Sequence, residues 1–341
     1  NVLDSKSVVH IPKVLYHTRI FDNTSHVGAG QTFSVPESSL SAVQAYIARE
    51  KLNAKVRYDI LNDVCHVDWQ LSKALQKITI VIVICDELAV FKPCLLSLVK
   101  VTAYNNFDIV IVDNGSIEPE TLNFLTIMGY DPRINVMRGE SGLNYSRAQN
   151  LAVSASMGEF ICLLRNNVEI FDPNWLMEML SIAVREGVGC VGGKLLSPDL
   201  TLKHAAENLG LGGYASHFHK LYSNHIAGEN CWAQIRQQVN AVSGTCLLVK
   251  RSILTEVDGF DDAYTSAYAD VDFCLRVSDL GYKNIYTPYA EVISNKIDFI
   301  SEECILKDAS LFDSRWQLSL QNTPFYSPNF TRSDDDLFRY E

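Results

Sequence analysis

The sequence predicts an α/β fold in which a mostly parallel sheet is flanked by helices. The chain has 341 residues, enough for one large domain with appendages or for two modest domains. Its residues are 47% hydrophobic and 20% charged, which suits a packed core and excludes a disordered chain. From residue 78 onward, short runs of β-branched residues alternate with helical segments, the order that is typical of doubly wound sheets.

The first 75 residues differ in texture from the rest and are predicted to form a connector. We expect a short strand at 8–20, a flexible loop at 25–33 and a helix at 36–52, which has Pro36 near its start. The sequence begins without Met and shows no signal-peptide layout. We therefore expect the chain to be part of a longer protein.

Five short apolar runs are the next predicted strands, and they cover residues 78–84, 107–113, 134–137, 160–164 and 189–193. Helical segments are expected between them at 88–103, 119–128, 145–156 and 173–186. A further strand is predicted at 244–250 and an amphipathic helix from Asp270, closed by Gly281. Strands that are apolar on both faces and separated by helices run parallel in a buried sheet.

Polar residues follow three of these strands. Cys85 and Asp86 follow the first, Asp113 and Asn114 end the second, and Arg165–Asn167 follow the fourth. Ligands of open α/β sheets bind outside the carboxyl ends of parallel strands. We therefore expect the three polar tips to face one crevice.

The stretch 112–116 reads VDNGS, an acidic strand end followed by a tight turn. Asp113 has the chemistry to accept hydrogen bonds from a nucleobase or a ribose, and Gly115 allows the backbone to approach a ligand. A plain Asx-turn is the alternative. Two glycine-rich stretches, 27–31 and 187–192, lack the strand-then-helix order of a dinucleotide site, so we discount both.

Carboxylates are dense late in the chain, at Asp258, Asp261, Asp262, Asp270 and Asp272. The last two lie at a helix start, where the helix dipole favours anions, so each has a capping role as its alternative. An ionised carboxylate beside the crevice also suits a general base, and Asp270 fits that role. The spacing of His204, His217, His219 and His225 matches no closed metal site.

The formal net charge is −11 with no long basic run, which argues against a nucleic-acid partner. The nine cysteines are scattered singly, without a CxxC pair, and indicate buried thiols in a reducing compartment. No stretch has the roughly 18 uninterrupted apolar residues of a membrane span.

Taken in order, these segments resemble one family, the GT-A-type glycosyltransferases of family 2, and within it the rhamnosyltransferase-like bacterial group. The segments that carry the resemblance span about 78–330 and include ITIVIVICDELAVFKPCLLSL, FDIVIVDNGSIEPETLNFL, GLNYSRAQNLAVSASMGEFICLLRNNVEIFDPNWLMEML, NAVSGTCLLVKRS and VDGFDDAYTSAYADVDFCLRVSDLGY. Several motifs in the family's order are far more specific than any one of them.

The resemblance implies a Rossmann-like GT-A domain at 76–330, preceded by the connector 1–75 and followed by a tail at 331–341. It implies inverting transfer of a sugar from a nucleoside-diphosphate sugar to a hydroxyl of a glycan or lipid-linked glycan, in bacterial surface polysaccharide synthesis. Mg²⁺ or Mn²⁺ normally neutralises the leaving diphosphate in this family. A cytoplasmic location, peripheral association with the inner face of the cell membrane, and a longer multidomain chain are further expectations.

The resemblance also assigns site residues, position by position. Asp270 takes the place of the catalytic base, and the acceptor side is bordered by Gly244, Thr245 and Asp272. The donor positions are Asp86 and Asp113 for the nucleoside, Asn144, Arg147 and Asn150 on the bordering helix, and Arg165, Asn166 and Asn167 at the metal motif.

Two departures from the family pattern concern the metal. The family's metal-binding Asp is Asn167 here, and the histidines that many members carry after the segment YTPYAEV (286–292) are replaced by Ser294, Asn295 and Lys296. We therefore expect weak metal binding or none, with Arg165, Arg147 or Lys296 as candidate counter-charges for a diphosphate. Two hypotheses stay open: an active transferase, favoured by Asp113 and Asp270, and a catalytically silent domain that binds a glycan or scaffolds a larger synthase.

Overall fold

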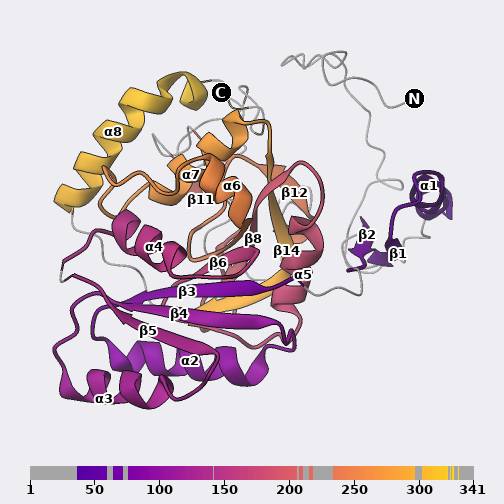
Figure 1. Cartoon of the computed structure of the whole chain (residues 1–341). Helices are drawn as coiled ribbons and strands as arrows, with labels where there is room; N and C mark the ends of the chain where they lie inside the picture. Colours follow the sequence, from indigo (N-terminus) through magenta and orange to yellow (C-terminus); the bar gives the residue numbers. More distant parts are fainter. Residues whose placement is uncertain are drawn as a thin grey trace.

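The computed structural model describes residues 37–59, 64–71, 76–140, 142–205, 207–209, 215–217, 233–295 and 302–321, with Thr323, Phe325 and Asn329. Its centre is a mixed sheet flanked by helices, which confirms the predicted α/β class (Figure 1). Within these residues the strand order is β12-β14-β8-β13-β6-β3-β4-β5, with β7 paired to β14 and β9 paired to β8.

The first half of the sheet consists of parallel strands: β3 (Ile78–Ile84), β4 (Phe107–Asp113), β5 (Ile134–Arg138) and β6 (Phe160–Leu164). The connecting helices are α2 (Leu88–Val101), α3 (Pro119–Met128) and α4 (Tyr145–Ser154). The central strands β3, β4 and β6 are largely buried because most of their residues are apolar, whereas β5 lies at the end of the strand order and is partly exposed. The predictions for this half are confirmed, and β5 runs one residue further than the sequence indicates.

The second half of the sheet is mixed. Its main strands are β8 (Val188–Leu196), β12 (Gln237–Val239), β13 (Cys246–Lys250) and β14 (Lys283–Ser294). Strand β13 runs antiparallel to both β6 and β8, whereas β14 runs parallel to β8. The reversal brings the amino end of β13 to the carboxyl end of β6, where Cys246 lies opposite Leu164. The parallel arrangement that the sequence predicts therefore describes the first half of the sheet.

Short strands and further helices complete the described residues. The strands are β7 (Val168–Glu169), β9 (Leu202–His204), β10 (Glu207–Leu209) and β11 (Ala215–His217). The helices are α5 (Trp175–Ala183), α6 (Arg251–Glu256), α7 (Ala269–Asp279) and α8 (Glu302–Gln321). No helix in this part of the chain is both long enough and apolar enough to cross a lipid bilayer.

Side chains alternate along the central strands and fill a separate core on each face of the sheet. On one face, Ile78, Ile80 and Ile82 pack with buried residues of α2, α3 and α5. On the other, Val81 packs with residues of α4, α6, α7 and α8, and Figure 1 shows these helices on the side opposite α2 and α3. A fully buried isoleucine contributes about 1.5–3 kcal/mol. The two cores hold the strand ends in fixed positions.

An α-helix and a hairpin precede the sheet: α1 (Glu37–Arg49), β1 (Ala54–Asp59) and β2 (Val64–Trp69), with β1 and β2 antiparallel. The helix confirms the one predicted at 36–52, while the hairpin was not predicted. The strand predicted at 8–20, the loop at 25–33 and the tail at 331–341 lie outside the described residues. The domain boundaries after residues 75 and 330 stay predictions.

The hairpin contacts the second half of the sheet. The ring of His66 stacks on Tyr289 with centroids 3.6 Å apart. Arg236 donates one hydrogen bond to the carbonyl of Val67 at 2.9 Å and another to Glu178 at 2.6 Å. Burial lowers the pKa of His66 to about 4, against the opposing effect of the Asp68 carboxylate. The imidazole is thus neutral near pH 7, as suits a ring stacked between packed elements.

Candidate active site

The carboxylate of Asp113 ends β4 and organises the turn that follows it. One oxygen accepts a hydrogen bond from the backbone N–H of Ser116 at 2.8 Å, and the other is bound by the guanidinium of Arg138. Arg138 also donates to the carbonyl of Ser116 at 2.7 Å. The Asp113 side chain is only 4% exposed, whereas that of Arg138 is 52% exposed. A buried carboxylate thus holds a half-exposed cation at the tip of β5.

Asp86 lies at the tip of β3, beside the same turn. Its backbone is left-handed, with φ at 54°, and its N–H donates to the Ser116 hydroxyl at 2.7 Å. Its carboxylate accepts from the N–H groups of Ile117 at 3.0 Å and Glu118 at 2.9 Å, just before α3. The β3, β4 and β5 tips therefore form one hydrogen-bonded unit. Burial and these carboxylates raise the pKa of the neighbouring Cys85 thiol.

The tip of β6 contacts the amino end of β13. The N–H of Arg165 donates to the carbonyl of Thr245 at 3.0 Å. The guanidinium of Arg165 lies over the ring of Tyr145, at the start of α4, 5.1 Å from its centroid. The N–H of Gly244 donates to Asp270 Oδ2 at 2.7 Å. Arg165, Tyr145, Gly244, Thr245 and Asp270 form a continuous group, which we call the base cluster.

Glycine is required at position 244 by the space around it. A Cβ there would lie 2.6 Å from the hydroxyl oxygen of Tyr145 and 3.1 Å from Oδ2 of Asp270. The second oxygen of Asp270 accepts from the N–H of Val271 at 3.0 Å. Asp270 is therefore held by backbone donors at the first turn of α7, with its side chain only partly buried.

The three predicted donor residues of α4 contact the loop before α7. Asn144 caps α4, because its side chain accepts from the N–H of Arg147 at 2.9 Å, and it also donates to the carbonyl of Asp262 at 2.8 Å. Arg147 lies 3.2 Å from the Asp262 carboxylate, with its own side chain 60% exposed. Asn150 pairs with both backbone groups of Phe260. These contacts anchor the loop, and a donor contact by these residues stays a prediction.

Asp272 lies behind Asp270 and faces α8. Its carboxylate is fully buried and accepts from Arg276 at 2.7 Å, Arg315 at 2.7 Å and the indole of Trp316 at 3.0 Å. Three donors satisfy the buried charge, which would otherwise be costly. The two carboxylates therefore have different surroundings: Asp270 is part of the base cluster, and Asp272 joins α7 to α8.

Asn167 and the end of β14 lie side by side. Asn167 is 1% exposed, and its backbone carbonyl accepts from the backbone N–H of Asn295 at 2.9 Å. Strand β14 pairs with β7, so that Ser294 lies opposite Val168. Lys203 of β9 donates from its Nζ to the Ser294 hydroxyl at 2.7 Å. A cation that the sequence reasoning missed therefore lies beside the strand tip 165–167.

The residues around this tip do not fit a divalent cation. Mg²⁺ and Mn²⁺ favour anionic carboxylate ligands, whereas the tip and the end of β14 supply a guanidinium, amides and a hydroxyl. The nearest contacted carboxylates, Glu87 and Glu169, accept from Asn166 at 3.4 Å and Asn295 at 3.1 Å. Within the described ranges, no three His, Cys, Asp or Glu side chains gather where they could hold a metal ion.

Another buried acid lies near the base cluster. Glu207 is 5% exposed and lies 3.2 Å from Nε2 of His204. Burial raises the pKa of Glu207 well above its ordinary value, with a smaller contribution from the Asp270 carboxylate and an opposing one from Arg165. Glu207 lies in an irregular stretch of the sequence and carries no periodic signal that would have predicted its place near the site. Arg138 and Tyr145 were also missed as site residues, but each has a signal that could have found it. Arg138 ends a predicted strand, and Tyr145 begins a predicted helix.

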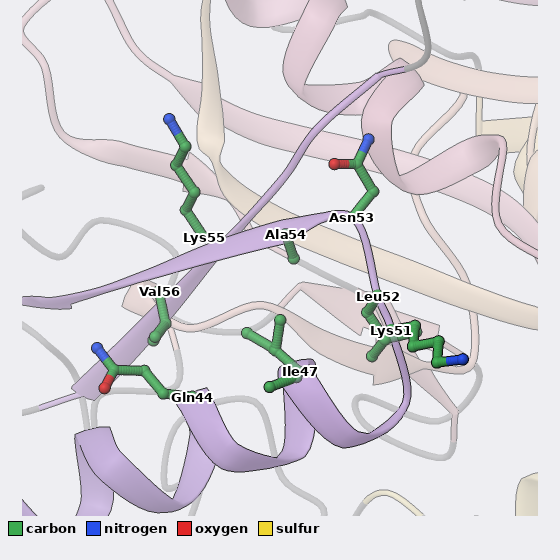
Figure 2. Close-up of a pocket in the computed structure, with 9 residues that line it drawn as sticks. Gln44, Ile47, Lys51, Leu52, Asn53, Ala54, Lys55 and Val56 are labelled. Carbon is green, nitrogen blue, oxygen red and sulfur yellow. The ribbon is translucent and has the colours of Figure 1, made fainter.

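A wide groove lies elsewhere, between α1 and β1, with a volume of about 670 Å³. Figure 2 shows Ile47 of α1 facing Ala54 and Val56 of β1, while Lys51 and Lys55 point outward. The groove has an aliphatic floor and no paired titratable groups. Because catalytic chemistry requires such groups, we place the candidate site at the strand tips and not in this groove.

Comparison with known proteins bears on the family of the chain. A family model described as Glycosyl transferase family 2 matches residues 79–258. The uncharacterized protein y4gI of Sinorhizobium fredii is 33% identical over 347 residues, which cover 98% of this chain and 38% of y4gI. The O-antigen biosynthesis protein RfbC of Myxococcus xanthus is 27% identical over 341 residues, which cover 97% of this chain and 26% of RfbC. The chain thus spans well under half of either relative.

One solved structure shows how far the fold is shared. The mannosyltransferase PcManGT of Pyrobaculum calidifontis, solved in complex with GDP-Man and Mn²⁺, superposes with a TM-score of 0.53. The match has 12% sequence identity and covers 84% of this chain and 74% of that one. At this identity the likeness shows the GT-A fold alone.

Proposed function

The chain belongs to glycosyl transferase family 2, and on that premise we propose that it is an inverting glycosyltransferase. The proposed reaction moves a sugar from a nucleoside-diphosphate sugar to a hydroxyl of a glycan or lipid-linked glycan. The observation that carries the proposal is the base cluster, in which Asp270 is held by the Gly244 backbone within one continuous group that reaches Arg165 at the β6 tip. A carboxylate and a guanidinium are thus arranged around the same strand end.

In the proposed reaction Asp270 acts as the general base. Its carboxylate takes the proton of the acceptor hydroxyl, whose oxygen forms a bond to the anomeric carbon. The bond from that carbon to the diphosphate oxygen breaks, and its electron pair leaves with the nucleoside diphosphate. A single displacement of this kind inverts the anomeric centre. Base assistance of this type is worth about 10²–10⁴-fold in rate.

The nucleoside end of the donor is assigned to the unit formed by Asp86, Asp113 and Arg138. Asp113 fixes the turn after β4, and its carboxylate is the group at this strand end with acceptor capacity for an imide or ribose donor. Arg138 keeps its guanidinium half exposed beside it. Together they supply one acceptor and one donor surface for the nucleoside.

The biological setting follows from the relatives and stays part of the proposal. RfbC is named for O-antigen biosynthesis, which supports a role in bacterial surface polysaccharide synthesis. A cytoplasmic site at the inner face of the membrane suits a lipid-linked acceptor. The order of the sequence motifs supports the rhamnosyltransferase-like group, and we propose a place in a longer multidomain protein because the chain spans 26% of RfbC.

The test is a panel of UDP-, GDP- and dTDP-sugars, with calorimetry for binding and release of nucleoside diphosphate for turnover. We expect at least one donor to bind tighter than about 1 mM and to be turned over slowly by transfer to water. If no nucleotide-sugar binds, the donor site is wrong. If one binds without turnover even when glycan acceptors are added, the alternative of a catalytically silent domain is correct.

A further inference from the structure

The ammonium of Lys203 is placed by contacts far apart in the sequence. Lys203 lies on β9, which pairs with β8 through Leu202 and His204. Its Nζ donates at 2.7 Å to the hydroxyl of Ser294, which is 2% exposed. Because Ser294 lies opposite Val168 in the ladder of β14 and β7, the ammonium is held next to the tip Arg165–Asn167. Lys203 is only partly buried.

Two cations lie around the β6 tip, where the carboxylates of Glu87 and Glu169 contact the amides of Asn166 and Asn295. Arg165 carries one positive charge, and Asn166, Asn167, Ser294 and Asn295 are neutral. Lys203 adds a second positive charge on the β14 side of the tip. Of the other cations expected at a diphosphate, Arg147 pairs with Asp262, and Lys296 lies outside the described residues.

We propose that Lys203 and Arg165 form a fixed cationic site for the diphosphate of the donor, in the place of a divalent metal ion. The inference rests on the proposed function, since it needs a nucleoside-diphosphate donor at this strand tip. Two fixed single charges equal the charge of one divalent ion. An ammonium suits a phosphate as a point charge, and a guanidinium can bind two oxygens at once.

The site would act on the leaving group. When the bond between the anomeric carbon and the diphosphate oxygen breaks, that oxygen gains negative charge. Donors that are already oriented toward this oxygen stabilise the developing charge without reorganisation. The bond to Ser294 and the packing of β9 on β8 would provide that orientation for Lys203.

The test is calorimetric titration of the full chain with inorganic pyrophosphate and with UDP, GDP and dTDP, in buffer that contains EDTA. We expect Lys203→Met to weaken binding of pyrophosphate and of the preferred nucleoside diphosphate by about 10- to 100-fold. Binding of the corresponding nucleoside, which lacks phosphates, should stay unchanged. Lys203→Arg, which keeps the charge, should recover most of the affinity.

Two further variants keep the test decisive. Lys77→Met removes a lysine that pairs with Asp108 at the amino ends of β3 and β4, away from the strand tips. This variant should leave binding unchanged. Ser294→Ala leaves the charge but removes the hydroxyl that orients it, so it should weaken pyrophosphate binding by a smaller factor even if Lys203→Met fails to fold. Wild-type affinity in both Lys203→Met and Ser294→Ala, or affinity that appears only with Mn²⁺, would overturn the inference. If the wild type binds neither pyrophosphate nor any nucleoside diphosphate, the proposed function falls with it.

Discussion

The strands β4 and β6 end at the same edge of the sheet, but their tips carry opposite charges. β4 ends in Asp113, a buried carboxylate whose oxygens are bound by Ser116 and Arg138. β6 ends in Arg165 and two amides, with Lys203 alongside. The first tip is organised around an anion that orients neighbouring donors. The second carries two cations, Arg165 and Lys203, while Glu87 and Glu169 contact its amides and the neighbouring Asn295.

The difference indicates how the two ends of a nucleotide-sugar would be held. A nucleoside offers hydrogen-bond donors, which a carboxylate recognises, whereas a diphosphate carries only negative charge and acceptors. The carboxylate tip is the one that the family pattern predicts. The second tip departs from that pattern at position 167, where an amide in place of the expected carboxylate removes one negative charge beside Arg165.

The largest effect is expected at Asp270, on the acceptor side of the cationic tip. Asp270→Asn keeps the side chain's size and an oxygen for the Gly244 N–H, but it removes the base. We expect kcat to fall by about 10²–10⁴-fold while donor affinity changes little. Turnover is measured by release of nucleoside diphosphate, and donor affinity by calorimetry.

The control for this change is Asp279→Asn, at the exposed far end of the same helix α7. It should leave both kcat and donor affinity at wild-type values. If Asp270→Asn turns over at the wild-type rate, then Asp270 is a structural contact of Gly244 and not the base.

A smaller effect, on binding instead of rate, is expected at Asp113. Asp113→Asn removes the charge that binds Arg138 and leaves the turn after β4 less well fixed. We expect nucleotide affinity to fall by about 1–3 kcal/mol, which is about 5- to 150-fold. Titration with the nucleoside and with the nucleoside diphosphate should show the same loss, because the change lies at the nucleoside end.

Asp131→Asn is the matched control, since Asp131 pairs with Arg133 at 2.8 Å just before β5, at the other end of that strand. That substitution should not alter nucleotide binding. Unchanged affinity in a folded Asp113→Asn variant would remove Asp113 from the donor site. A loss for pyrophosphate as well as for the nucleoside would mean that the two tips are not separate.

Much of this fold was predictable from the sequence because the first half of the sheet is built from local signals. The runs 78–84, 107–113 and 160–164 are mostly apolar and are rich in β-branched or large aliphatic residues, so their bounds could be predicted to the residue. Strand β14 was missed, since Pro288 and register shifts interrupt its alternation. Helix α8 was also not predicted, although its sequence carries a helical signal: the apolar residues Phe312, Trp316 and Leu320 are spaced four apart, and all three are buried.

The residues of the candidate site likewise fall into two groups, those that local sequence signals predict and those that depend on long-range packing. The sequence predicted the tip residues Asp86, Asp113 and Arg165 and the base candidate Asp270 because each lies at the end of a recognisable element. Lys203 was not predictable, since its contact with Ser294 spans 91 residues and depends on how β9 and β14 are placed beside β8. Contacts of that kind come from packing and leave no local pattern.

The most direct measurement compares donor affinity in EDTA and in Mn²⁺, for the wild type and for Asn167→Asp. We expect the wild type to bind its nucleoside diphosphate equally well in both conditions, because fixed cations hold the diphosphate. Asn167→Asp introduces a carboxylate at the tip, so its binding should become stronger with Mn²⁺ and weaker without it. Wild-type affinity that rises by tenfold or more with Mn²⁺ and is lost on chelation would contradict the claim that this site works without a metal.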